Sequence, residues 1–149
     1  MKNARPLNEE ESSAPNRSDF TATFPHRHGT VAAEVLRRLL DGERLTSLDA
    51  VFDSHTTRLA AFVHYLTRDY GWEVSRIDKA VGTVDGRVTE IREYFLAPAL
   101  LQQARAAGAA EYTALVTEAR AIQRAAASKA KIEAKRRNTR RLLPVVAHV

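Results

Sequence analysis

The 149-residue sequence contains no cysteine. This absence excludes disulfide bonds, cysteine-ligated zinc, iron–sulfur clusters and catalysis by a thiol. It also fits a reducing compartment, and we expect the protein to be cytoplasmic. The folded core must be held together by packing alone.

Long apolar runs are also missing. Residues 1–16 carry Lys2 and Arg5, but three glutamates, Glu9 to Glu11, then stand where a secretory signal would have its apolar segment. No stretch approaches the roughly 20 apolar residues that a membrane-spanning helix needs. We therefore expect a soluble, intracellular protein that does not act at a membrane.

Charge is distributed unevenly along the chain, whose formal net charge is +5. Residues 1–28 carry four basic and four acidic side chains, and residues 29–95 carry nine basic against eleven acidic ones. Residues 96–149 carry ten basic against three acidic side chains, a balance of +7. A basic segment of this kind is the usual footprint of a phosphate-binding surface, although the centre of the chain is slightly acidic.

The opening segment, residues 1–27, shows neither helical nor strand periodicity. It mixes Glu, Ser, Asn and Arg with three prolines, a composition typical of a disordered arm. Phe20 and Phe24 are the large apolar residues near its end, and they could fix that end to the domain that follows.

Helical periodicity begins after Thr30, which is suited to cap a helix that Gly42 ends. Its apolar residues recur every three or four positions, and Glu34 is expected on the opposite, polar side. A second, short helix is predicted after Thr46, where Thr46 and Asp49 form an approximate capping box. Its expected apolar side consists of Leu48, Val51 and Phe52.

A third helix is predicted from Thr56 or Thr57 to Tyr70, because Gly71 is a typical helix stop. Its buried side is expected to consist of Leu59, Val63, Leu66 and Phe62. The period then changes to alternation in residues 72–77, and apolar residues return in residues 87–96. The Asp85-Gly86 pair between them is a strong signal for a β-hairpin turn.

The remainder of the chain is rich in alanine and is predicted to be helical, in a first piece over residues 98–107 and a longer one after Gly108. An apolar rhythm over residues 111–128 is typical of a helix that packs on a partner helix, so a homodimer through this segment is one expectation. Residues 142–149 form a short apolar tail that Pro144 interrupts.

A resemblance to a known family rests on short stretches in this order. They are Leu45-Thr46-Ser47-Leu48-Asp49-Ala50, then Arg58-Leu59-Ala60-Ala61, then Val63, Leu66 and Gly71. These stretches resemble the small winged helix-turn-helix domains of bacteria, phages and prophages. The family's Leu-Arg pair is replaced here by Leu66-Thr67-Arg68, and the hairpin is longer. The resemblance covers about half of the chain and implies a domain that binds double-stranded DNA with its third helix.

The fold class expected is therefore mainly α, a winged helix-turn-helix followed by a long basic helix. We divide the chain into a disordered arm (1–27), a winged helix-turn-helix domain (28–96), a helical extension (97–141, basic from residue 129) and a tail (142–149). The expected function is that of a transcriptional regulator of bacterial or phage type that reads the major groove with helix 56–70.

The reading surface follows from helical spacing, because a recognition helix buries one face and offers the other to the major groove. The outward residues expected are Thr57, Arg58, Ala61, Tyr65 and Arg68. His55 and Thr56 stand at the helix start, where exposed amides can meet a phosphate. On the hairpin, Arg87, Lys79 and Arg76 are candidates for the DNA backbone.

Several of these residues have an alternative interpretation. Arg58 could pair with Asp49 or Asp53, and Tyr65 could be a residue at the edge of the core. Arg76 is more readily explained as a solvated strand residue. The histidines His26, His28, His55 and His64 match no ligand spacing, so we expect neither a metal site nor a cofactor.

The C-terminal run has seven cations and one acid in residues 129–141. The cations are Lys129, Lys131, Lys135, Arg136, Arg137, Arg140 and Arg141. If helical, this run would neutralise several phosphates and make DNA binding depend steeply on salt. A solvated helix end is the alternative, and basic tails also bind RNA or anionic membranes.

Two other function classes compete with DNA binding. An interaction module would use the winged fold to dock on a protein, and an exposed patch of Phe62, Tyr65 and Trp72 would favour it. An enzyme would need a nucleophile beside a base or a glycine-rich phosphate loop. The sequence offers neither, since Ser54-His55 lies where a helix cap is needed, and no enzymatic activity is expected.

Overall fold

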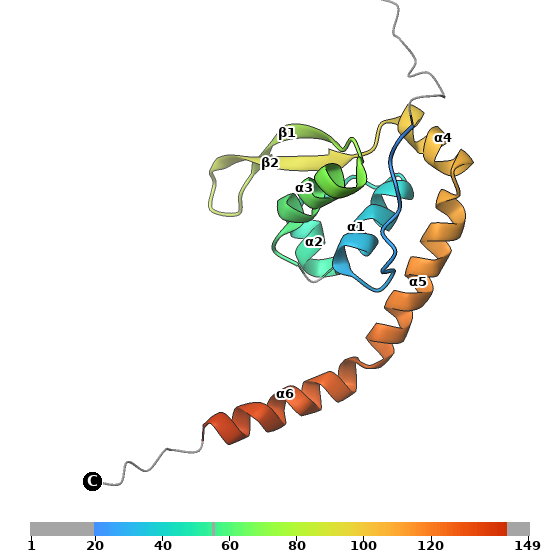
Figure 1. The fold of residues 1–149 in the computed structure, drawn as a ribbon. Coiled ribbons are helices and arrows are strands. Elements are labelled where there is room, and N and C mark those ends of the chain that lie inside the picture. Colours follow the sequence, from blue (N-terminus) through green and yellow to red (C-terminus); the bar gives the residue numbers. More distant parts are fainter. Residues whose placement is uncertain (1–19, 55, 143–149) are drawn as a thin grey trace, which may run out of the picture.

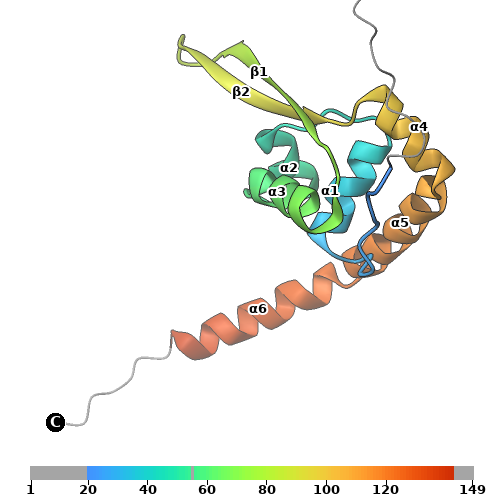
Figure 2. The same cartoon turned by 45° about the horizontal axis from the view of Figure 1, so that its top comes forward.

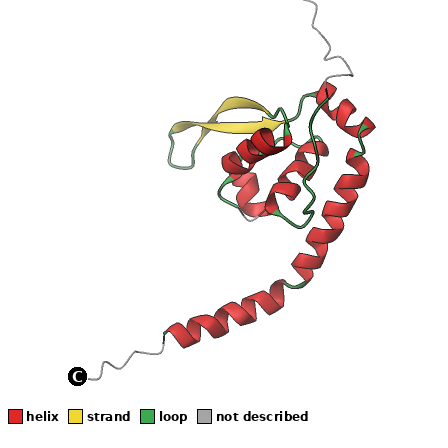
Figure 3. Cartoon of the chain, in the orientation of Figure 1, coloured by secondary structure: helices red, strands yellow, loops and turns green. Residues whose placement is uncertain are grey.

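The structure, a computed structural model, describes residues 20–54 and 56–142. Its elements, in chain order, are α1 (Val31–Leu40), α2 (Ser47–Ser54), α3 (Leu59–Tyr70), β1 (Ser75–Gly82), β2 (Val88–Phe95), α4 (Pro98–Ala106), α5 (Ala109–Ala125) and α6 (Ala127–Arg141) (Figure 1). The mainly helical architecture with one hairpin confirms the expected fold class (Figure 3).

The helix ends follow the predicted capping residues. Thr30 caps α1 because its hydroxyl accepts a 3.1 Å hydrogen bond from the Ala33 amide. At α2, the Thr46 amide donates to the Asp49 carboxylate at 2.9 Å, and the Asp49 amide donates to the Thr46 hydroxyl at 3.3 Å. This reciprocal pair is the predicted capping box. Gly71 ends α3 in the left-handed conformation, with φ of +74°.

The predicted start of α3 is wrong by two to three residues. Thr56 and Thr57 precede the helix, which begins at Leu59. The Thr56 hydroxyl accepts a hydrogen bond from the Arg58 amide at 3.1 Å, and the Thr56 amide donates to the Ala50 carbonyl. These local bonds compete with helical ones, so the chain turns here instead of coiling.

The predicted apolar side of α2 is also wrong for Leu48 and Val51. Ala50 and Ser54, one turn apart, are the buried residues of this helix, whereas Leu48 is 65% exposed and Val51 is 38% exposed. The small side chains allow α2 to lie close to α1 and α3, which it contacts. The side chain of Phe52 lies outside the described part of the chain.

The hairpin, which we call the wing, is antiparallel from the Ser75–Phe95 pair to the Gly82–Val88 pair. Its turn contains the predicted Asp85-Gly86, and Gly86 takes a φ of +80° that favours glycine. At the other end, the backbones of Leu45 and Tyr94 exchange two hydrogen bonds of 2.8 Å. The base of the wing is thereby joined to the segment that precedes α2.

α5 packs on α1 of the same chain. Tyr112, which belongs to the apolar rhythm that suggested a partner helix, is buried in the core together with Val116, Ala104 and Ala109. Glu34, expected on the polar side of α1, is only 1% exposed because α5 covers it. The predicted long helix after Gly108 is wrong in one respect, since it breaks at Ala126 into α5 and α6.

The segment of residues 20–27 packs against the helices. The ring centroid of Trp72 lies 5.8 Å from that of Phe20 and 5.4 Å from that of Phe24. The Trp72 indole N–H donates to the Thr23 carbonyl at 2.7 Å, and Phe24 stacks on Tyr112 at 4.8 Å. The prediction that Phe20 and Phe24 fix this end is confirmed, and residues 20–27 differ from a disordered arm. The rest of the predicted arm lies outside the described residues.

Candidate nucleic-acid interface

The outer face of α3 is separated from the core as predicted. Leu59, Val63 and Leu66 are at most 8% exposed and Phe62 is half-buried. Thr57, Arg58, Ala61, Tyr65 and Arg68 are all exposed. Thr56 is half-buried, with its hydroxyl bonded to the Arg58 amide, and His55 lies outside the described residues.

Arg58 stands at the N-cap position of α3, at the end where the helix begins. Neither of the acids expected as alternative partners is available to it. Asp53 accepts from Arg38 at 3.0 Å, and Asp49 caps Thr46. Within the described part of the chain Arg58 forms no ion pair, so its guanidinium is free to contact a ligand.

Arg68 is held by its neighbour. Its Nε and Nη2 atoms donate to the two carboxylate oxygens of Asp69 at 2.9 and 3.1 Å. The hydrogen bonds raise the pKa of Arg68 and lower that of Asp69. To bind a base or a phosphate, Arg68 must first leave this carboxylate.

Tyr65 lies at the boundary between the core and the outer face. It is 36% exposed, and its ring meets that of Tyr70 edge-on at 5.4 Å. The two hydroxyls are 3.3 Å apart, and this hydrogen bond is the main cause of a raised pKa of Tyr70. Tyr65 is therefore partly exposed while both its ring and its hydroxyl contact Tyr70.

The wing carries four cations and four acids. Arg87 donates to Asp85 at 2.7 Å, and Arg92 donates to Asp78 at 2.8 Å. These contacts, together with the Thr83 hydroxyl at Asp85, lower the pKa of both carboxyls. Lys79 lies 3.8 Å from Glu93. Arg76 is exposed and forms no ion pair in the ranges the structure describes, so it is the wing cation most available to a phosphate.

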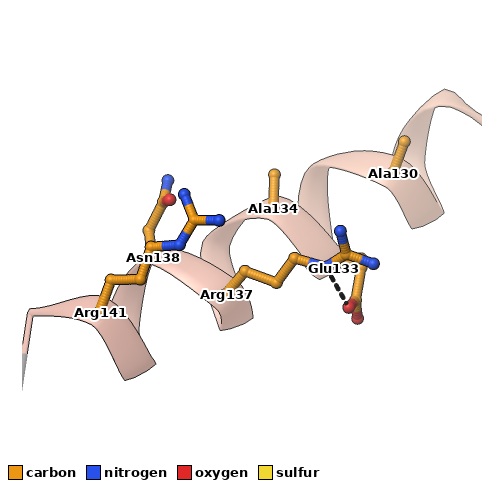
Figure 4. A pocket seen from close by; sticks show the side chains of 6 residues that line it. All are labelled: Ala130, Glu133, Ala134, Arg137, Asn138 and Arg141. Atoms are coloured by element: carbon orange, nitrogen blue, oxygen red, sulfur yellow. Dashed lines mark hydrogen bonds and ion pairs between the residues drawn. The ribbon is translucent and has the colours of Figure 1, made fainter.

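α6 buries none of its residues. Glu133 accepts hydrogen bonds from Arg136 at 2.9 Å and from Arg137 at 2.8 Å, and both lower its pKa. Figure 4 shows the Glu133–Arg137 pair on a face of the helix that also bears Arg141. Five other cations of α6 form no ion pair within residues 20–54 and 56–142. They are Lys129, Lys131, Lys135, Arg140 and Arg141.

The wing and α6 extend to the same side of the molecule. In Figure 1 and again in Figure 2, α2 and α3 lie between them. Both projecting elements carry basic side chains, so α2 and α3 lie between two basic parts of the chain.

The described histidines are His26, His28 and His64, and the first two line one surface pocket with Thr23 and Phe24. Across the described residues, no three His, Asp or Glu side chains are grouped as a metal ion would require. His28 meets the Tyr112 ring edge-on at 5.6 Å, and His64 is exposed on α3. Over the same residues, no helix has the length and apolar character needed to cross a membrane.

Sequence comparison identifies the central part of the chain. Residues 30–99, just under half of the sequence, match the family model of a winged helix-turn-helix domain. The matched range contains α1, α2, α3 and the wing, in the order typical of that fold. Comparisons with curated proteins and with solved structures gave no match.

Proposed function

Because residues 30–99 are a winged helix-turn-helix domain, a fold that supports DNA binding in general, we propose that this protein is a sequence-specific DNA-binding regulator of bacterial or phage type. The observation that carries the proposal is the exposed outer face of α3, with the guanidinium of Arg58 forming no ion pair among the described residues. An α-helix fits the major groove of B-DNA, and arginine can bind a guanine through two hydrogen bonds.

In this proposal α3 reads bases and other elements hold the protein on the backbone. Arg58 and Tyr65 contact base edges, and Ala61 allows the helix to approach closely. Arg68 joins them once it leaves Asp69. His55, Thr56 and Thr57 approach a phosphate near the helix start, where the amides and the helix dipole favour an anion.

Phosphate contacts come from the wing and from α6. Arg76 and Arg87 reach the backbone beside the groove. The α6 cations, Lys129, Lys131, Lys135, Arg136, Arg137, Arg140 and Arg141, add sequence-independent affinity. The acidic side chains of the domain do not oppose this role where arginines already neutralise them, as Arg38 does for Glu43 and Arg37 for Asp41.

A homodimer through residues 111–128 remains part of the proposal. Leu115 and Ile122 lie one heptad apart on α5 and are 48% and 67% exposed. They are the large apolar residues of this helix left for a partner, since Tyr112 and Val116 serve the core. A palindromic DNA site would support this symmetry.

The alternative, an interaction module without DNA reading, depended on an exposed patch of Phe62, Tyr65 and Trp72. Trp72 is fully buried and Phe62 is half-buried, so that patch does not exist. A mobility-shift assay on pooled genomic DNA at low salt, with light scattering alongside, separates the two functions. A shifted complex supports the proposal, whereas no shift together with a stable protein complex supports the alternative.

A further inference from the structure

The second half of α5 lacks apolar anchors. Its buried residues, Ala109, Tyr112 and Val116, all lie in the first eight positions of the helix. Ile122, the large apolar residue of the second half, is 67% exposed. The contacts that hold this end of α5 to the domain must therefore be polar.

These polar contacts converge on the carboxylate of Glu34, in the first turn of α1. Its Oε2 atom accepts from Arg120 Nε at 2.6 Å, and its Oε1 atom accepts from Arg124 Nη2 at 2.6 Å. Arg120 Nη1 also donates to the Gly29 carbonyl at 3.3 Å and to Gln123 Oε1 at 2.9 Å. Charge-assisted bonds of this kind have strict geometry. We name Glu34, Arg120 and Arg124 the Glu34 cluster.

The Glu34 cluster lies immediately before α6. Arg124 is followed by the break at Ala126, whose amide donates to the Gln123 carbonyl at 3.1 Å. Since α6 has no buried residue, none of its side chains packs into the core of the described part of the chain. Its direction depends on the end of α5 and on the break.

That direction leaves α2 and α3 between α6 and the wing in both views (Figures 1 and 2). A helix of 15 residues is about 22 Å long, which matches roughly six base pairs of B-DNA. With seven cations against Glu133, its surface fits a phosphate backbone better than a second copy of itself, because two such helices would repel each other.

We propose that the Glu34 cluster is a positioning device that fixes the direction of α6, so that α6 lies along duplex DNA flanking the site read by α3, on the side opposite the wing. This inference rests on the proposed DNA binding. A fixed helix binds flanking phosphates without the ordering cost that a freely moving arm would incur.

The direction of α6 can be measured without DNA. Because the chain has no cysteine, Ser47→Cys on α2 and Thr139→Cys on α6 give two unique positions for spin labels, both exposed. Pulsed electron paramagnetic resonance should give one narrow distribution of the distance between the two labels in the full chain. Glu34→Gln or Arg124→Ala should broaden this distribution. Arg105→Ala removes an exposed arginine of α4 and should leave it unchanged. A broad distribution in the parent, or a narrow one in both cluster variants, overturns the proposal.

The effect of the Glu34 cluster on DNA binding is tested by measuring affinity for duplexes of different length. A duplex selected from a random pool by the full chain is shortened to its core site or extended by about ten base pairs, one helical turn, on either side. Extension on one side should raise affinity about tenfold for the parent and for Arg105→Ala, and less than about threefold for Glu34→Gln and Arg124→Ala. If extension raises the affinity of all four proteins equally, or does not raise that of the parent, the positioning role is refuted. The proposed DNA-binding function is not refuted by either result. Failure of the full chain to select or bind any duplex refutes the proposed function itself.

Arg124→Ala keeps the test valid if Glu34→Gln does not fold correctly. The Arg124 side chain is 54% exposed, so its removal leaves the rest of the core intact. Circular dichroism should give the same helix content for all four proteins.

Discussion

Glu34 of α1 and Arg120 of α5, 86 positions apart in the sequence, form a 2.6 Å ion pair in which the two side chains are 2% and 13% exposed. The pair joins the helix that opens the winged helix-turn-helix domain to a helix beyond the 30–99 match. The folded unit that presents α3 therefore includes α5.

Replacement of Glu34 by alanine should lower the free energy of unfolding by about 3 kcal/mol, because Arg120 would remain nearly buried without its counter-charge. Urea denaturation followed by circular dichroism measures this change. Glu43→Ala is the matched control, since Glu43 pairs with Arg38 while its own side chain is 43% exposed, and it should cost less than about 1 kcal/mol. Equal losses in the two variants would contradict a special role for Glu34.

The buried hydroxyl of Tyr112, which has no hydrogen-bond partner among the described residues, predicts a dependence of stability on alkaline pH. Burial raises the pKa of Tyr112 above its ordinary value of 10.0. Above about pH 10 the unfolded chain loses this proton and the folded protein keeps it, so stability should fall as pH rises further. Thermal melts from about pH 8 to 11, a window that spans the ordinary tyrosine pKa, should show a smaller fall for Tyr112→Phe than for the parent. Identical falls would contradict the prediction.

Local chemistry in the sequence predicts the helix caps, the wing turn and the buried face of α3. Thr30, Thr46, Asp49 and Gly71 act through neighbours within a few residues, so their roles can be inferred without the fold. The burial of Glu34 could not be inferred in this way, because it depends on an arginine 86 positions away. The predicted burial of Leu48 is wrong for a similar reason. Periodicity alone favours burial of the larger side chains, whereas Ala50 and Ser54 are the side chains that face the neighbouring helices.

In the candidate site, too, the sequence predicts some features and not others. The exposure of Arg58, Ala61 and Arg68 follows from helical spacing near α3. Their partners do not, because the pairing of Asp53 with Arg38 instead of Arg58 is a tertiary contact. A sequence motif with an acid next to an arginine, such as Arg68-Asp69, is the signal that could have indicated the pair found there.

Arg58 is predicted to read a base and not only to attract the backbone. Arg58→Ala should weaken binding to a selected duplex by roughly 10- to 100-fold at fixed salt, as removal of a two-bond guanine contact would. Arg58→Lys keeps the charge but lacks the planar fork, so it should recover less than half of the missing binding free energy. Fluorescence anisotropy titration measures both. Full recovery in Arg58→Lys would reduce its role to a phosphate contact.

Release of Arg68 is predicted to strengthen binding. Asp69→Ala removes the carboxylate that holds the Arg68 guanidinium at 2.9 and 3.1 Å, and affinity for the same duplex should rise about threefold. The double variant Arg68→Ala/Asp69→Ala tests the cause, because removal of a negative charge alone would raise affinity there as well. If the double variant binds as tightly as Asp69→Ala, Arg68 does not contact DNA.

The α6 cations should set the salt dependence of DNA binding. Lys129, Lys131 and Lys135 form no ion pairs among the described residues, so each is available to neutralise a phosphate. Their joint replacement by alanine should lower the slope of log affinity against log salt by about 2 to 3, since each neutralised phosphate contributes about 0.9. The sequence preference of the protein should stay the same. An unchanged slope would mean that α6 is a solvated helix end.

The central claim is that α3 of this winged domain reads a DNA sequence. Selection from a random double-stranded pool, run in parallel with the parent and with Arg58→Ala at one salt concentration, tests it most directly. We expect the parent to enrich one defined motif and Arg58→Ala to lose the preference at a guanine within that motif. Enrichment of no motif by the parent, or of the same motif with the same preference by both proteins, would contradict it.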